Sequence, residues 1–434
     1  MRVKLRDDLI RRMSVRGRSQ DGSFWPPSMT SQFRVCPVPF HLDTYRGCTY
    51  GCEYCFARDR QEFSRRMKPE DERSFSFLMP NRPERFRAWI RRVAELETPE
   101  AVAFRSRLVL KIGANADPCP PSEARDCVTR SVLEALAEVD YPVQIQTKNP
   151  GILLPYVKSN PGANLVISTT ITTADDAISA KVEPGAPRTS KRLRDMRLLA
   201  EAGAKLFVKI QPAFWPRIID EIPKIARLLK EAGAFGFNTE GLKLRAVMPV
   251  SEKLHFRAIS VALGYDLRAT YRKFKRIEGG DFVLPMALIR RYSDVAVEAA
   301  RENGLRYYSA DNGIGMVGDG DECCGTAELR DYTLWRRNNR SQVFHGKCGP
   351  KHCFALDDVL VSFTRSKRFA KWTMREAVEG RRRPRSSARA ESGPEAEPES
   401  TSSPVANHDQ ISVHRAYYSN NMTARVGHLR RPAP

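Results

Sequence analysis

Apolar positions along the middle of the chain recur with two different periods. Between residues 85 and 96, Phe86, Trp89, Ile90 and Val93 fall on one face of a helix, whereas the next apolar run, 108–112, is short and typical of a strand. The same change of period repeats downstream. The pattern predicts helices at 85–96, 122–138, 190–202 and 218–231, and strands at 108–112, 143–147, 165–169, 206–210, 234–238 and 243–248.

Strands that alternate with helices of this length indicate βαβ units and a parallel sheet. Five or six repeats without a dinucleotide-binding motif at the start favour a full or partial barrel, with functional side chains just after the strands. Residues 250–304 have a helical pattern, clearest at 285–303, and a short strand follows at 305–309. From there to about residue 355 the chain is rich in Gly and Cys.

This pattern divides the chain into four segments. We expect a basic, then Pro-rich leader at 1–40, a barrel at 41–250, a helical and Cys-rich C-terminal region at 251–378 and a tail at 379–434. The tail mixes Arg, Ser, Pro and Glu and cannot bury enough apolar surface to order itself, so we expect it to be disordered.

The charge of the chain is strongly positive, at +21 over 434 residues. The tail holds nine Arg and six acidic residues, so residues 1–378 carry a net charge of +18. A basic body is expected for a protein that binds DNA or RNA, although Arg-rich chains also occur without such a partner. No apolar run is long enough to span a bilayer and the first dozen residues are charged, so we expect a cytoplasmic protein without a membrane partner.

The ten cysteines fall mostly into clusters, which in a reducing compartment suggest metal binding more than disulfides. The most informative cluster is C-x3-C-x2-C at Cys48, Cys52 and Cys55. Three thiolates on one tight loop can bind three irons of a [4Fe–4S] cluster and leave the fourth iron open to a chelating ligand such as S-adenosylmethionine. A zinc site is the alternative, and it would need Cys36 or His41 as a fourth ligand.

The cysteine spacing, with an aromatic residue before the last Cys, resembles the signature of radical S-adenosylmethionine enzymes. Further blocks resemble the spore photoproduct lyase branch of that superfamily, and together they cover roughly residues 40–215. The blocks are 43–58 (DTYRGCTYGCEYCFAR), 113–117 (GANAD), 146–149 (QTKN), 167–170 (ISTT), 182–185 (VEPG) and 191–203 (KRLRDMRLLAEAG). The resemblance implies an α/β fold, a partial (β/α)6 barrel, here with a helical, Cys-containing C-terminal extension.

The resemblance also implies roles for individual residues. Cys48, Cys52 and Cys55 would bind the [4Fe–4S] cluster, and a reductant such as flavodoxin or ferredoxin would supply its electron. The residues that would contact S-adenosylmethionine are Tyr54 near the adenine, Lys148 and Ser168 at the carboxylate and ribose, Asn115 and Ala116 beside them, and Glu183 at a ribose hydroxyl or orienting a neighbour. The plain alternatives are an exposed lysine for Lys148, a turn hydroxyl for Ser168 and a surface acid for Glu183.

One departure from the branch concerns the turn at 113–117. Photoproduct lyases carry a cysteine there as hydrogen donor, and this chain has Ala114. Cys119 could swing into the same space as a catalytic thiol, or it could be a packed structural residue between two prolines. A radical reaction other than photoproduct repair is therefore the main expectation.

A second group of thiols, Cys323, Cys324, Cys348 and Cys353, is a candidate for an auxiliary iron–sulfur cluster or a structural zinc. Buried or partly exposed free thiols are the alternative. For the whole protein two hypotheses follow. The first is a radical S-adenosylmethionine enzyme that abstracts hydrogen from an unidentified substrate, for which nucleic acid is the favoured class and a peptide or a small metabolite the alternatives. The second is a non-catalytic zinc protein that binds nucleic acid.

Overall fold

The computed structural model describes residues 24–29, 36–57, 79–96, 98–246, 250–278, 280–311, 317–319 and 323–334, together with one short strand pair near the C-terminus. That pair joins β14 (Leu360–Val361) to β15 (Trp372–Thr373) in antiparallel order. The predicted disordered tail at 379–434 and most of the predicted leader lie outside the described residues.

The centre of the molecule is an eight-stranded sheet. Its strands, in spatial order, are β1 (Ser28–Met29), β2 (Phe40–Leu42), β5 (Leu110–Ile112), β6 (Val143–Thr147), β7 (Leu165–Thr170), β8 (Lys205–Ala213), β9 (Ala234–Gly241) and β13 (Arg306–Ser309). Every pairing from β2 to β13 is parallel, and β1 alone runs antiparallel to β2. The predicted α/β class and the succession of parallel βα units are therefore confirmed.

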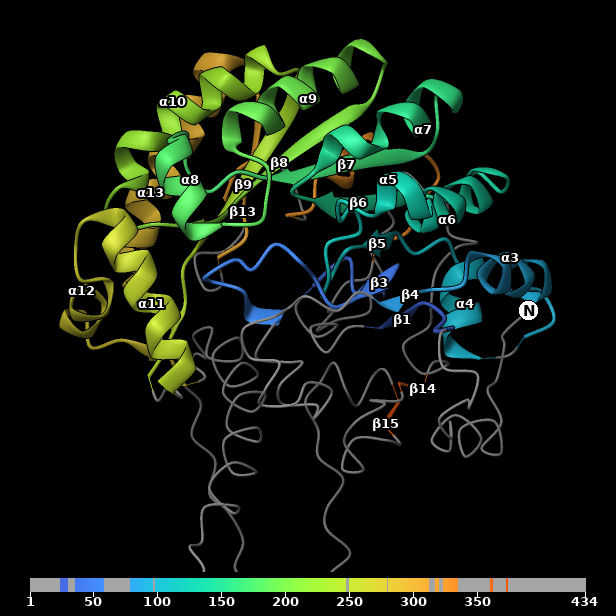
Figure 1. Ribbon diagram of the computed structural model, residues 1–434, viewed down its shortest axis with the longest axis horizontal. Helices are drawn as coiled ribbons and strands as arrows, with labels where there is room; N and C mark the ends of the chain where they lie inside the picture. The colour runs from blue at the N-terminus through green and yellow to red at the C-terminus, as the bar shows by residue number, and fades with distance from the viewer. Residues whose placement is uncertain are drawn as a thin grey trace, which may run out of the picture.

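Helices connect the parallel strands and follow one side of the curved sheet (Figure 1). They are α3 (Pro83–Arg92), α4 (Pro99–Arg105), α5 (Glu123–Asp126), α6 (Val128–Ala137), α7 (Leu154–Ser159), α8 (Asp176–Val182), α9 (Thr189–Glu201), α10 (Ile218–Glu231) and α13 (Met286–Asn303), with the 3-10 turn η2 (Pro150–Leu153) before α7. No helix among the described residues is long and apolar enough to cross a membrane.

Smaller elements complete the described structure. Helices α11 (Val250–Leu263) and α12 (Leu267–Lys273) follow the sheet strand β9 in the sequence, and β3 (Tyr45–Arg46) pairs with β4 (Met79–Pro80) in antiparallel order. A separate three-stranded sheet contains β10 (Leu244–Arg245), β12 (Asp281–Phe282) and β11 (Ile277–Glu278), and the 3-10 turn η3 (Thr326–Glu328) lies near the end of the described chain.

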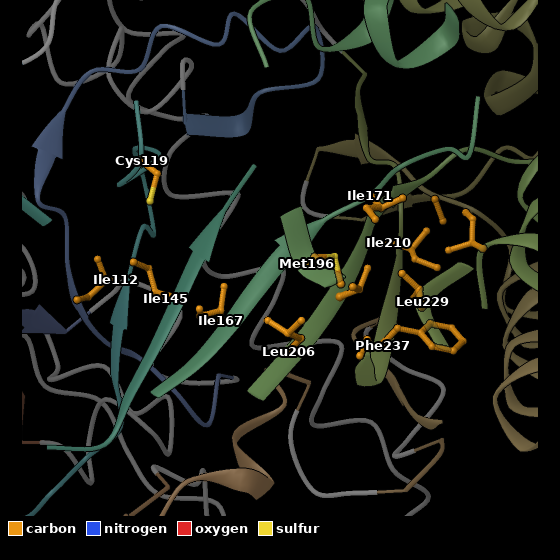
Figure 2. Packing of buried hydrophobic residues seen from close by; sticks show 14 of the residues in the cluster. Ile112, Cys119, Ile145, Ile167, Ile171, Met196, Leu206, Ile210, Leu229 and Phe237 are labelled. Carbon is orange, nitrogen blue, oxygen red and sulfur yellow. The ribbon is translucent and has the colours of Figure 1, made fainter. Parts of the chain in front are cut away.

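The main core lies between the sheet and its helices. Ile112, Ile145, Ile167 and Leu206 are successive cross-strand partners on β5 to β8, and each is at most 1% exposed. Figure 2 shows them in a row across the sheet. Because side chains alternate between the two faces of a strand, the residues next to this row face the opposite, concave side. That concave side carries the polar side chains described below.

Several predicted boundaries are wrong, for identifiable reasons. The barrel does not end at residue 250, because β13 pairs with β9 and α13 packs against α10. The predicted strand at 243–248 is reduced to β10, which lies outside the main sheet. The predicted helix at 122–138 is broken at Cys127, whose φ of 50° is left-handed. The predicted leader at 1–40 also contributes to the sheet through β1 and the first residue of β2.

Candidate active site

The three clustered cysteines lie on the loop that follows β3. Cys52 is 8% exposed, and Cys48 and Cys55 are half-buried. All three pack in one small cluster with Tyr50 and Ala186. Burial is the main cause that raises the pKa of the Cys48 thiol to about 12 and raises that of Cys52 as well. These thiols are therefore held in a low-dielectric pocket to which both the loop and Ala186 contribute.

One wall of this pocket is the turn after α8. The Gly185 amide donates to the Tyr50 carbonyl at 3.0 Å, and the Glu53 amide donates to the Val182 carbonyl at 2.9 Å. A Cβ on Gly185 would lie 2.6 Å from the Thr49 carbonyl oxygen. The glycine of the E-P-G block is thus required because two backbone segments meet there without room for a side chain.

A second turn that contacts the loop, at 113–117, is held in place by Asp43. One Asp43 carboxylate oxygen accepts the backbone amides of Ala114 and Asn115, both at 2.9 Å, and the other accepts the Asn115 side-chain amide at 2.8 Å. The turn begins at Gly113, where φ is +91° and a Cβ would lie 2.4 Å from the Gln146 carbonyl. Asn115 therefore has its side-chain amide bound to Asp43, and its contact with S-adenosylmethionine stays a prediction.

A second carboxylate, Asp117, joins this turn to the end of β6. It accepts hydrogen bonds from the Thr147 hydroxyl at 2.7 Å, the Lys148 amide at 2.8 Å and the Cys119 amide at 3.0 Å. Burial raises the pKa of Asp117 in spite of these donors. Asp117 therefore fixes the position of the strand end that carries Lys148.

Glu183 and Arg192 form an ion pair in which both side chains are fully buried. The Arg192 guanidinium also donates to the Thr170 carbonyl at 2.8 Å and the Pro187 carbonyl at 2.7 Å. Glu183 in addition accepts the Tyr54 hydroxyl. Although burial opposes it, the Arg192 charge holds the pKa of Glu183 below its usual value. The reading of Glu183 as a surface acid is wrong, and the reading in which it orients a neighbour, here Tyr54, fits these contacts.

Lys148 lies between the cysteine loop and this ion pair. Its ammonium is 5.5 Å from the centre of the Tyr54 ring. Burial acts to lower the pKa of Lys148, but the nearby Cys52 and Glu183 outweigh it, so the pKa is raised and the cation is favoured. The structure therefore brings together Cys52, Tyr54, Lys148 and Glu183, four residues that are spread over 132 positions of the sequence.

Ser168 lies inside β7 rather than in a turn, so the reading of its side chain as a turn hydroxyl is wrong. It is fully buried, and its hydroxyl has no hydrogen-bond partner. A buried hydroxyl without a partner is costly, and it marks a place where a ligand group could complete the hydrogen bonding. Ala116, in the turn beside Asn115, is 7% exposed and offers only backbone atoms.

Cys119 is fully buried and belongs to the main hydrophobic core (Figure 2). Its carbonyl accepts the Tyr50 hydroxyl and, at 3.2 Å, the Asn149 side-chain amide. These hydrogen bonds fix the backbone of Cys119, and its side chain is packed among the buried residues of the core. The arrangement therefore favours the alternative in which Cys119 is a packed structural residue.

The second thiol group is only partly described, because Cys348 and Cys353 lie outside the described residues. Cys323 and Cys324 pack with Cys36 on the concave side of the sheet. Among the side chains that the structure describes, no group of three or more His, Cys, Asp or Glu could hold a single metal ion. The auxiliary cluster or zinc stays a prediction.

The described residues fit the cofactors that the sequence implies. Three thiols on one loop are a suitable donor set for a [4Fe–4S] cluster, in which each thiolate binds a different iron. The cation of Lys148 and the Ser168 hydroxyl, which has no hydrogen-bond partner, suit a ligand that carries both a carboxylate and hydroxyl groups.

The sequence analysis did not predict Asp43, Asp117 or Arg192 as residues of the site. Asp117 follows the predicted strand at 108–112 as an acidic residue, which was the available signal; Asp43 and Arg192 had no such signal.

Comparison with known proteins gives distant matches. No protein-family model matches the chain. Three uncharacterised mycobacterial proteins, one from Mycobacterium bovis and two from strains of Mycobacterium tuberculosis, are each 26% identical over 215 residues, which is 48% of this chain. The chain covers 60% of the length of these relatives.

Two kinds of solved structure are similar. Spore photoproduct lyase complexed with dinucleoside spore photoproduct is 15% identical, with a TM-score of 0.44 over 63% of this chain and 77% of that chain. Streptococcus suis SuiB bound to S-adenosylmethionine is 12% identical, with a TM-score of 0.40 over 64% of this chain and 51% of that chain.

Proposed function

We propose that this protein is a radical S-adenosylmethionine enzyme of the photoproduct-lyase-like type. The observation that carries the proposal is that the three-cysteine loop, which is hydrogen-bonded to the turn after α8, lies beside the Lys148 ammonium, 5.5 Å from the centre of the Tyr54 ring. When bound, the cluster and S-adenosylmethionine supply a 5′-deoxyadenosyl radical, which forms when one electron cleaves the sulfonium and which abstracts a hydrogen atom from the substrate.

Each residue of the site then has a role that follows from its chemistry. Cys48, Cys52 and Cys55 would hold three irons as thiolates. The Lys148 ammonium would bind the carboxylate of S-adenosylmethionine, and the Ser168 hydroxyl would find in its ribose the partner that it lacks. Glu183 is already bound to Arg192 and Tyr54, so its role would be to orient the Tyr54 ring against the adenine.

The proposal also extends to the electron donor and to the substrate. A reductant such as flavodoxin or ferredoxin would supply the electron. The charge of +21 favours a polyanionic partner, DNA or RNA, which the long-range field of the protein would attract. Ala114 carries no thiol, so we do not propose repair of a thymine photoproduct through a donor at that turn.

Anaerobic reconstitution with iron and sulfide tests the function. We expect about four irons per chain, and 5′-deoxyadenosine after addition of dithionite and S-adenosylmethionine. Cys52→Ala should lose both, whereas Cys127→Ala, at the junction of α5 and α6, should retain both. Stoichiometric zinc without 5′-deoxyadenosine would instead support the non-catalytic zinc protein.

A second arm addresses the substrate. The reconstituted enzyme is incubated with undamaged DNA, with ultraviolet-irradiated DNA and without nucleic acid. A rate of 5′-deoxyadenosine formation that rises with either DNA above the uncoupled rate supports a nucleic-acid substrate. An identical rate in all three reactions argues for a different substrate class while leaving the cofactor chemistry in place.

A further inference from the structure

The concave side of the sheet carries an unusual set of polar residues. Lys111 and Gln144 are cross-strand partners on β5 and β6, and Lys209 and Asn238 are partners on β8 and β9. Each alternates with helix-facing core residues such as Ile112 and Ile145, so all four side chains face the inside of the curved sheet. Gln144 and Asn238 are fully buried, and Lys209 is 2% exposed.

Thiols lie among these side chains. The Lys209 ammonium is 3.8 Å from the Cys324 sulfur, and Cys324 is 1% exposed. Cys36 and Cys323 pack in the same group of side chains as Cys324. A buried ammonium group therefore lies beside a buried sulfur on this face of the sheet. We call Cys36, Lys111, Gln144, Lys209, Asn238 and Cys324 the interior cluster.

The positive charge of the interior cluster is not balanced by carboxylates. Neither Lys111 nor Lys209 lies within ion-pair distance of an Asp or Glu of the described chain. Glu240, the carboxylate that acts on Lys111 over a longer distance, is bound to Lys243 at 2.6 Å. A buried ammonium without a full counter-charge is costly, so an anion that reached this position would be held strongly.

Two amides in the interior cluster also have unused hydrogen-bonding atoms. The nitrogen and the oxygen of the Gln144 side chain are both buried without a partner. Asn238 donates to the Cys323 carbonyl, but its own side-chain oxygen has no partner. Buried amides normally have their partners, so these atoms indicate a polar ligand.

We propose that the interior cluster binds an oxyanion of the substrate, a carboxylate or a phosphate, through Lys111 and Lys209, with the Gln144 amide as an additional donor. The ligand is taken to be the substrate because the cluster shares the concave face of the sheet with Ser168 on β7, and because Gln144 lies on β6, the strand that ends just before Lys148; in this respect the inference rests on the proposed function. Two ammonium groups beside the thiols oppose a metal cation at this position.

Isothermal titration of the full chain with sodium phosphate and with sodium acetate, at constant ionic strength in chloride, tests this site. Saturable binding of either anion is expected, and the tighter one identifies the oxyanion. Lys209→Gln and Lys111→Gln should each weaken binding on the order of tenfold. Lys224→Gln, which changes an exposed lysine on α10, should leave it unchanged. Absence of saturable binding to the wild-type protein, or unchanged binding in both interior variants, would overturn the proposal.

A charge-preserving variant and a thermal measurement distinguish loss of the anion site from misfolding of the variant. Lys209→Arg should retain most of the affinity that Lys209→Gln loses. Phosphate or acetate, whichever binds, should raise the melting temperature of the wild-type protein but not that of Lys209→Met; an equal rise in both contradicts the assignment. Neither measurement uses S-adenosylmethionine, so a failure of the anion site and a failure of the proposed radical chemistry give different results.

Discussion

Glu183 and Arg192 form an ion pair that is wholly removed from solvent and that joins the turn under the cysteine loop to helix α9. Removal of one partner leaves an uncompensated buried charge, so Arg192→Met should lower the free energy of unfolding by about 3–5 kcal/mol. Urea denaturation of the iron-free protein measures this.

The double variant Glu183→Gln/Arg192→Met is the control for that prediction. It removes both charges and should be more stable than Arg192→Met alone, because no carboxylate is then left without its cation. Additive losses from the two substitutions would show that the pair does not act as a unit.

Glu123 should stabilise the fold through the start of α6. Its buried carboxylate accepts the Thr129 amide at 3.1 Å, the Arg130 amide at 2.9 Å and the Tyr45 hydroxyl at 2.5 Å. Glu123→Ala leaves these donors unsatisfied and should cost about 3 kcal/mol of unfolding free energy. Glu134→Ala, which removes only a partly exposed ion pair with Arg130, should cost less than about 1 kcal/mol. Similar losses in the two variants would contradict the assigned role.

Lys148 should determine affinity for S-adenosylmethionine without affecting iron binding. Lys148→Met keeps the length of the side chain but removes the cation that would bind the carboxylate, so the Kd measured by equilibrium dialysis should rise about tenfold or more. Iron content should stay at the wild-type level. Lys158→Met, on the exposed side of α7, is the matched control. An unchanged Kd in Lys148→Met would remove this residue from the binding site.

Asp311 should make the stability depend on pH. Its carboxylate accepts the Tyr292 hydroxyl and, at 3.0 Å, the Gly241 amide, while burial and then Glu240 raise its pKa to about 6. The folded protein holds this proton more tightly than the unfolded chain, so the carboxyl's contribution to stability is present below about pH 4 and is lost as the pH rises through about 6.

The variant Asp311→Asn isolates this effect. It should be more stable than the wild type at pH 7.5 by up to about 3 kcal/mol, with a smaller advantage at pH 4.5. Urea unfolding at the two values measures the difference. A constant difference between the two proteins over this range would contradict the raised pKa.

Local patterns were enough to predict the strands at the centre of the sheet. Residues 143–147 match β6, and 165–169 match β7 apart from its last residue, because a buried parallel strand is a short apolar run that needs no distant information. Local patterns could not place residues 243–248, since strand propensity does not say which sheet a strand joins. They also missed the break at Cys127, which depends on the contacts of Glu123 with α6.

In the candidate site, too, only the features with a local sequence signal could be predicted. The spacing of Cys48, Cys52 and Cys55 is a local signal, and it led to the loop that the structure places in a buried pocket. The burial of Arg192 could not be predicted, because an arginine on a helix normally faces solvent and its partner here comes from a separate turn. The fully buried position of Glu183 was missed for the same reason.

The cysteine loop is held by segments that come much later in the chain. Tyr50 binds the carbonyl of Cys119, and Tyr54 binds Glu183, so the contacts that shape the loop span 69 and 129 residues. A growing polypeptide cannot make these contacts until β7 and the turn after α8 have been synthesised. The loop should consequently take its final shape late in biogenesis, only after the strands up to β7 have been made.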